Sequence, residues 1–352
     1  MFHPVHCVAH GKVAVRALLV LFAVSSGTAF AQLTTPGSLS LESALNLAQT
    51  RSSLLLAQDS AATASREMAV STGQLLDPTL QLGINNLPVT SADRFSVSRD
   101  FMTMRSIGVM QEFTRNDKRE ARAARYEREA QVADAGRTLT IVNLQRETAM
   151  TWLERYNSER MREVLIQQRD EAKLQIEAAD MAYRIGKGSQ ADVFTARSAV
   201  AQIEDRFAQA YRQILAANIK LTRWIGDADA LSLDRLPTMD KPGVELTSLD
   251  TVVAHHPQIA VLKRQENVAQ VDVVIAQSNK RADWSEELMF RQRGSAFSNM
   301  ISINVSVSLQ WDQKNRQDRE LAAKLTLVEQ ARAQTEQMTR EHAAEIRAMV
   351  IE

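Results

Sequence analysis

The sequence predicts a mainly α-helical chain with a small β part, in which a unit of helix, two strands and long helical hairpin occurs twice. Residues 301–311 alternate strictly between apolar and polar side chains, as a strand with one apolar face does. Residues 137–185 are 49 residues without glycine or proline, a length far beyond an ordinary globular helix. The order of elements in the first half of the chain then recurs in the second half.

The apolar face of the alternating stretch has six members: Ile301, Ile303, Val305, Val307, Leu309 and Trp311. Eleven residues is about the length that a tilted strand needs to cross a bilayer. A terminal Trp suits a membrane–water interface, because its ring is apolar and its N–H is polar. A half-buried strand of a soluble sandwich is the alternative, and this stretch alone leaves both interpretations open.

The N-terminus has the pattern of a secretory signal peptide, predicted over residues 1–31. Lys12 and Arg16 supply the positive charge, residues 17–24 are apolar, and Ala29-Phe30-Ala31 fits a cleavage site. Removing these residues leaves 40 of the 42 basic residues against all 42 acidic ones. A near-neutral mature chain argues against a nucleic-acid partner. The only cysteine, Cys7, lies inside the signal, so we expect no disulfide and no thiolate metal site.

The first copy of the unit is predicted within residues 32–226. A helical pattern over 40–76 stops at Pro78, and two short alternating runs follow at about 79–84 and 106–113. A helical hairpin is predicted over 117–226, with its tip at residues 184–189.

A linker is predicted at 227–247, and the second copy at 248–352. This copy has a helix over 248–280, strands at about 284–291 and 301–311, and a further helix from 314 onward. The sequence ends within that helix, so we expect the second copy to be truncated by roughly seventy residues relative to the first.

This architecture resembles the TolC-like outer membrane efflux protein family over essentially all of residues 38–352. The most specific local similarity is the tip, Tyr183-Arg184-Ile185-Gly186-Lys187-Gly188-Ser189-Gln190-Ala191-Asp192-Val193, which is similar to that family's Tyr-x-x-Gly tip followed by Asp-Val. Within the family, the stretches 86–88, 93–96, 100–104 and 281–284 are most similar to the heavy-metal branch, of the cobalt–zinc–cadmium type.

The resemblance implies a homotrimer in the outer membrane of a Gram-negative bacterium. Each protomer would give four strands to one twelve-stranded β-barrel, and the helices would continue it as a coiled-coil tube across the periplasm. The implied partners are outer-membrane lipid, a periplasmic adaptor (membrane fusion) protein and an inner-membrane pump of the resistance-nodulation-division type. In the family the tip meets the adaptor, which here implicates Arg184, Ile185, Gly186, Lys187, Gly188, Ser189 and Asp192.

Several side chains invite a chemical interpretation, and each has an ordinary structural alternative. His255 and His256 are adjacent, so they point about 100° apart on a helix and are poor co-ligands; capping or surface roles are favoured. Met102, Met104 and Met110 could bind a soft metal ion or simply pack. Glu286 and Glu287 face opposite sides of a strand, so neither is expected to be catalytic.

Basic side chains follow the predicted strands at residues 118, 119 and 122 and again at 316 and 319. They could anchor the chain at a membrane interface or form a solvated helix face. No catalytic triad, phosphate loop or metal-ligand spacing is found in the sequence, so we expect neither an enzyme nor a bound cofactor.

Three classes of function remain. The favoured one is a passive duct for heavy-metal cations, powered elsewhere. The others are a duct for drugs or for type I protein secretion, and a periplasmic coiled-coil interaction protein without a barrel.

Overall fold

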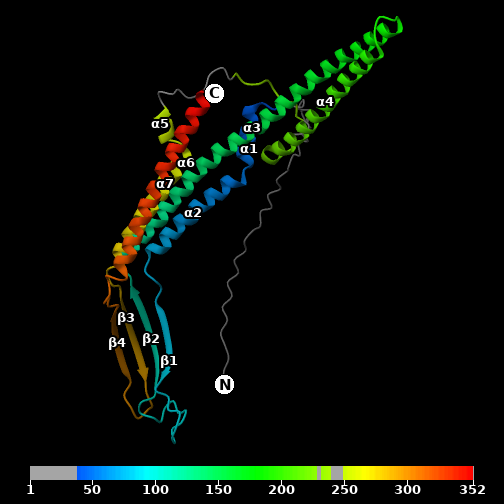
Figure 1. Cartoon of the computed structure of the whole chain (residues 1–352). Coiled ribbons are helices and arrows are strands. Elements are labelled where there is room, and N and C mark those ends of the chain that lie inside the picture. The colour runs from blue at the N-terminus through cyan, green and yellow to red at the C-terminus, as the bar shows by residue number, and fades with distance from the viewer. Residues whose placement is uncertain (1–37, 228–230, 239–248, 352) are drawn as a thin grey trace, which may run out of the picture. The chain divides into compact units, whose positions relative to one another are not determined.

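The computed structural model describes residues 38–227, 231–238 and 249–351, which belong to the unit Ser38–Glu352 (Figure 1). The predicted signal peptide and part of the predicted linker lie outside the described residues. The helices are α1 (Leu41–Arg51), α2 (Ser53–Gly73), α3 (Asn116–Arg184), α4 (Gln190–Ile225), α5 (Leu249–Ala254), α6 (Pro257–Ser278) and α7 (Gln317–Ile351). The strands are β1 (Thr79–Asn85), β2 (Met104–Phe113), β3 (Trp284–Gln292) and β4 (Met300–Val307). The predicted fold class, mainly α with a small β part, is confirmed.

The four strands form one antiparallel sheet in the order β1-β2-β3-β4. Each half of the chain contributes a hairpin, and the two hairpins join through β2 and β3. Their register places Phe113 opposite Trp284, with the two rings stacked 4.3 Å apart. The sheet is open, so β1 and β4 each keep one unpaired edge within the described residues.

The helices pack around α3, whose 69 residues correspond to about 100 Å. It contacts α1, α2, α4 and α6, and α6 in turn packs against α7. Many buried positions along these contacts are alanines, including Ala121 and Ala130 in α3 and Ala210 and Ala217 in α4. Small side chains allow two helix backbones to approach closely, which explains the alanine-rich composition of the long helices.

A compact core forms where α1 meets α3 and α4. Trp152 is fully buried there, and its Nε1 donates a hydrogen bond to the carbonyl oxygen of Leu39 at 3.0 Å. Leu39 also forms a parallel bridge with Leu233. The segment after α4 is therefore fastened to the start of the described chain.

Two predicted helices are each divided in the structure. The helix predicted over 40–76 breaks at Ser52, and the one predicted over 248–280 breaks at His255 and His256. Pro257 opens α6 because a proline is tolerated in the first turn of a helix, where its missing N–H has no partner to lose. The two breaks occupy equivalent places in the two copies.

The strand predicted over 301–311 is too long. β4 ends at Val307, because Val307 lies opposite Trp284, the first residue of β3, and the partner strand goes no further. Gln310 instead donates to the carbonyl oxygen of Asn279 at 2.8 Å. Leu309 and Trp311 therefore lie beyond the sheet. Over the described residues, no helix combines the length and the apolar character that a membrane-spanning helix requires.

Candidate functional site

One face of the sheet is apolar and exposed. Its side chains come from alternate positions of all four strands: Leu80, Leu82 and Ile84; Ile107, Val109 and Phe113; Trp284, Leu288 and Phe290; and Ile301, Ile303, Val305 and Val307. Those of β4 are 72, 65, 62 and 54 % exposed, values that exclude burial against another described element. The face spans about 27 Å along the strands from Phe113 to Arg105, or about 20 Å after a 35–45° tilt.

Two polar side chains interrupt this face, and two more, Arg105 and Gln292, lie in its last row beside Ile84. Gln111 pairs with Glu286 across β2 and β3, one row inside the stacked Phe113 and Trp284. The row on the helical side of this pair is apolar and contains the aromatic side chains Phe113 and Trp284. The next rows toward the loops are apolar as well. The interruption by Gln111 and Glu286 is therefore confined to one row near the helical end of the sheet.

The opposite face is polar and built from small side chains. In β4 it presents Ser302, Asn304 and Ser306, and in β3 it presents Ser285, Glu287 and Arg291. Methionines also lie on this face; Met289 is buried over Gly108, where an added Cβ would meet its Cα and Cβ at 3.2 Å. The two faces are thus chemically opposite over the length of the sheet.

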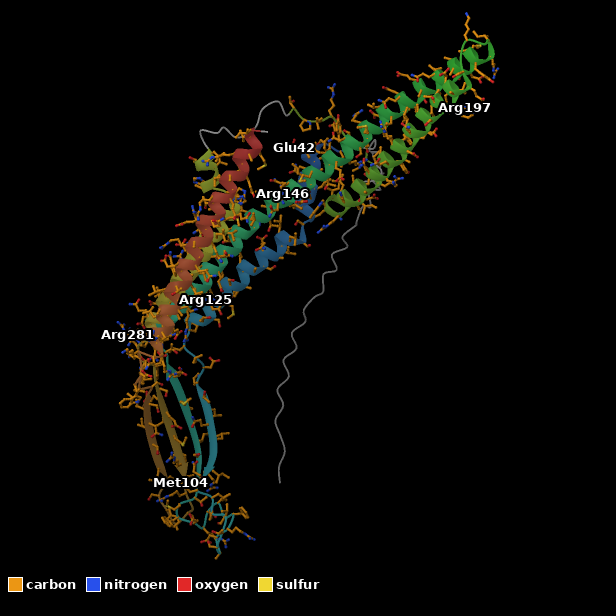
Figure 2. All side chains as sticks on the ribbon, viewed as in Figure 1. Glu42, Met104, Arg125, Arg146, Arg197 and Arg281 are labelled. Atoms are coloured by element: carbon orange, nitrogen blue, oxygen red, sulfur yellow. The ribbon has the colours of Figure 1, made fainter. Side chains whose placement is uncertain are left out.

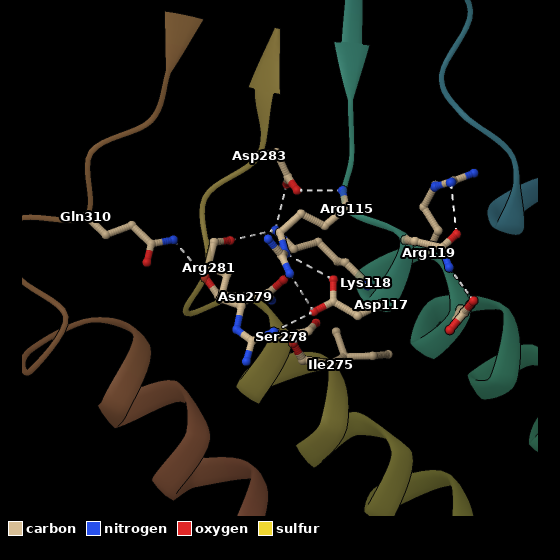
Figure 3. Close-up of polar contacts among 12 residues, drawn as sticks. Arg115, Asp117, Lys118, Arg119, Ile275, Ser278, Asn279, Arg281, Asp283 and Gln310 are labelled. Atoms are coloured by element: carbon tan, nitrogen blue, oxygen red, sulfur yellow. Dashed lines mark hydrogen bonds and ion pairs between the residues drawn. The ribbon is translucent and has the colours of Figure 1, made fainter.

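A polar network joins the sheet to the helices (Figure 3). Lys118, on the first turn of α3, is buried, and its Nζ lies 2.6 Å from Asp283 Oδ2, just before β3. The same ammonium donates to the carbonyl oxygen of Arg281 at 3.3 Å, and the backbone N–H of Arg115 donates to Asp283 Oδ1 at 3.0 Å. These contacts fix the start of β3 against the start of α3, so Lys118 is neither a membrane anchor nor a solvated side chain.

The electrostatics of this junction favour two ionised carboxylates. Burial raises the pKa of Asp283, but the Arg115 N–H and the Lys118 ammonium outweigh burial and leave that pKa below its ordinary value. A hydrogen bond from the Arg115 guanidinium lowers the pKa of Asp117, which Arg281 also contacts at 3.2 Å. The junction is therefore a set of paired charges.

Further along the helices, Asp272 of α6 ties three helices together. Its carboxylate lies 2.8 Å from Arg125 Nε of α3 and 2.9 Å from Lys324 Nζ of α7. In Figure 2, Arg125 lies in the helical part of the chain, between the sheet and the hairpin tip. Arg281 lies closer to the sheet, where the helices meet it.

The hairpin tip lies where it was predicted, between α3 and α4. Gly186 has φ +74°, a left-handed conformation that favours glycine, and an added Cβ there would meet no atom within 4 Å. An added Cβ on Gly188 would instead meet Ala182 Cβ at 3.1 Å. Ser189 caps α4 in a reciprocal capping box with Asp192, whose pKa is lowered by the backbone N–H and hydroxyl of Ser189. Asp192 therefore helps to cap α4. At Gly186 no side chain covers the backbone, and the space beside it is open.

The adjacent residues His255 and His256 form different contacts. His256 caps α6, because its Nδ1 accepts a hydrogen bond from the Gln258 N–H at 3.3 Å, whereas the Nδ1 of His255 contacts the Thr251 carbonyl at 2.8 Å. The ring of His256 instead meets that of His342 on α7, with centroids 4.4 Å apart. The expected capping role of the pair is therefore confirmed for His256, and the contact with His342 could not be read from the sequence.

The methionines do not converge. Met104 and Met110 share the polar face but are six residues apart on one strand, about 20 Å, and Met102 lies in the preceding loop. Among the residues that the structure describes, no three His, Cys, Asp or Glu side chains are grouped as a metal site. Glu286 and Glu287 face opposite sides of the sheet, as their spacing predicted.

No protein-family model matches this chain. No curated protein matches it either.

Solved structures do match, and the three that follow have low sequence identity to this chain. The Campylobacter jejuni CmeC outer membrane channel gives a TM-score of 0.69 over 87 % of this chain and 69 % of that one, with 11 % identity. The outer membrane protein VceC of Vibrio cholerae gives 0.68 over 88 % and 78 %, with 16 % identity. CusC, a protein that forms a transmembrane channel, gives a TM-score of 0.65 over 87 % of this chain and 73 % of that one, with 13 % identity. The chain therefore has the fold of outer-membrane channel proteins.

Proposed function

We propose that the protein is the outer-membrane duct of a tripartite efflux system, passively conducting substrate that an inner-membrane pump and a periplasmic adaptor deliver. Three protomers would close twelve strands into one barrel, with β4 of one protomer pairing with β1 of the next. In this proposal the protein is a conduit and not an enzyme.

The exposed apolar face of the sheet carries this proposal. A soluble protein rarely exposes so continuous an apolar surface, and the opposite face is already polar. A strand edge facing lipid is not tolerated, so the edges of β1 and β4 require partners. A closed barrel in a membrane meets these three requirements. Lipid covers the apolar face, water contacts the polar face, and strands of further copies pair with the edges of β1 and β4. A coiled-coil protein without a barrel would leave both the face and the edges unexplained.

We infer that the substrate is a heavy-metal cation, on the resemblance of residues 86–88, 93–96, 100–104 and 281–284 to the metal branch. Deletion in the source organism is expected to raise sensitivity to zinc, cobalt, cadmium, copper or silver. A plasmid copy of the deleted gene should restore tolerance and yield a detergent-resistant trimer in the outer-membrane fraction. Sensitivity to dyes and detergents alone would assign the duct to drug export, and a chain found only in the soluble periplasmic fraction would contradict a duct altogether.

The adaptor is proposed to contact the tip, residues 184–189. The open space around Gly186 supports this, because two backbones can approach closely where side chains are missing. Gly186→Leu is expected to abolish adaptor cross-linking and export while leaving the trimer intact. Gly186→Asn is the matched control for backbone strain, since Asn tolerates the left-handed conformation. Normal cross-linking in Gly186→Leu would reduce the tip to a turn.

A further inference from the structure

Two opposite charges lie on the polar face of β3. Glu287 and Arg291 are four residues apart, so they share this face about 13 Å from one another. Glu287 Oε2 accepts a hydrogen bond from Asn304 Nδ2 at 2.9 Å, and Arg291 Nε donates one to Met289 Sδ at 3.4 Å. Within the described part of the chain, neither forms an ion pair. Each therefore presents an uncompensated charge to the space in front of this face.

The charge on this face changes sign along the strands. Glu112 of β2 is exposed on the same face and lies one row nearer the helices than Glu287. Arg291 lies near the opposite end, where β3 leads into its loop. The polar face is thus acidic toward the helices and basic toward the loops.

We propose that Glu287 and Arg291 set the ion selectivity of the lumen, as an acidic ring and a basic ring arranged in series. This inference rests on the proposed trimeric duct, in which each side chain occurs three times around the lumen. Rings of charged side chains raise the local concentration of counter-ions and exclude ions of like charge. At about 0.1 M salt the Debye length is about 10 Å, so rings about 13 Å apart act largely as separate elements.

The test is the cation-to-anion permeability ratio of the full chain in planar bilayers under a gradient of KCl near 0.1 M. Glu287→Gln is expected to lower this ratio, and Arg291→Gln to raise it, each by at least about twofold. Arg291→Lys should keep the wild-type ratio, because it retains the charge. In about 1 M KCl the differences should nearly vanish, since the Debye length falls to about 3 Å.

The sheet supplies matched controls on its other face. Glu286 precedes Glu287 and belongs to the apolar face, and Arg105 pairs with Gln292, beside Arg291 but on the apolar face. Glu286→Gln and Arg105→Gln therefore remove the same charges at nearly the same heights outside the lumen. Both variants should leave the permeability ratio unchanged.

The outcomes separate this inference from the function on which it rests. A conducting wild type whose selectivity is unchanged in both Glu287→Gln and Arg291→Gln would overturn the inference and leave the duct intact. Equal shifts in the two control variants would also overturn it, because the charges would then act from either face. A correctly inserted trimer without conductance would contradict the duct itself and the inference with it.

Discussion

At the scale of single residues, Lys118 and Asp283 determine how the sheet meets the helices. Their side chains are only 6 and 21 % exposed, so removing one partner leaves a largely desolvated charge behind. Lys118→Met is expected to lower the free energy of unfolding by about 2–3 kcal/mol, somewhat less than for a fully buried pair. Urea unfolding of the detergent-solubilised protein, followed by tryptophan fluorescence, measures this difference.

The matched control is an ion pair of equal length on the surface. Arg66 Nη2 and Asp134 Oδ2 are also 2.6 Å apart, but both side chains are half exposed. Exposed pairs contribute little, because water solvates the separated charges nearly as well. Asp134→Asn should leave the unfolding midpoint unchanged, and equal losses in the two variants would show that burial does not decide the strength of the Lys118 contact.

At the scale of elements, α6 depends on a titratable cap. Burial, and secondarily the charge of His342, lower the pKa of His256 below its ordinary 6.5. A histidine whose pKa is lowered on folding contributes stability that is complete above pH 6.5 and is lost as pH falls from there through the folded-state pKa. Protonation also removes the lone pair that accepts the Gln258 N–H. Acid should therefore loosen the start of α6.

Hydrogen exchange at the Gln258 amide, corrected for the intrinsic rate, follows this effect. Since a helix cap contributes about 1 kcal/mol, protection should fall by up to about fivefold as the pH falls below 6.5 and His256 becomes protonated. His256→Asn, which caps without titrating, should remove this pH dependence, and His255→Asn should preserve it. A dependence that survives in His256→Asn would assign the titration to another group.

The elements also show what local sequence can and cannot predict. The strands, the long helices and the tip follow from alternation, from the absence of glycine and proline and from the spacing of Gly186, which are local signals. The break at Ser52 carries no strong local signal, because a serine is tolerated inside helices. The end of β4 was missed because it depends on where β3 begins, and the strictly alternating residues continue past it.

At the scale of the whole molecule, the two-faced sheet and its junction with the helices depend on the pairing register of segments that are far apart in the sequence. The sequence predicted that Ile301–Val307 share one apolar face, but not that all four strands align their apolar residues on that side. The contact of Lys118 with Asp283 joins residues 165 apart, and the position of Arg291 on the polar face follows only from the pairing of β2, β3 and β4. The periodicity of a single segment does not show which residues of another segment it will pair with.

In the proposed duct, one face of the sheet contacts lipid and the other contacts water. Because Cys7 is the only cysteine, a Cys7→Ser background allows single spin labels at positions 301 to 306 of β4. In reconstituted trimers, labels at 301, 303 and 305 should be accessible to oxygen, and labels at 302, 304 and 306 to a water-soluble nickel chelate. This alternation is expected because successive side chains of a strand point to opposite faces. Accessibility without alternation, or with the two sets exchanged, would contradict it.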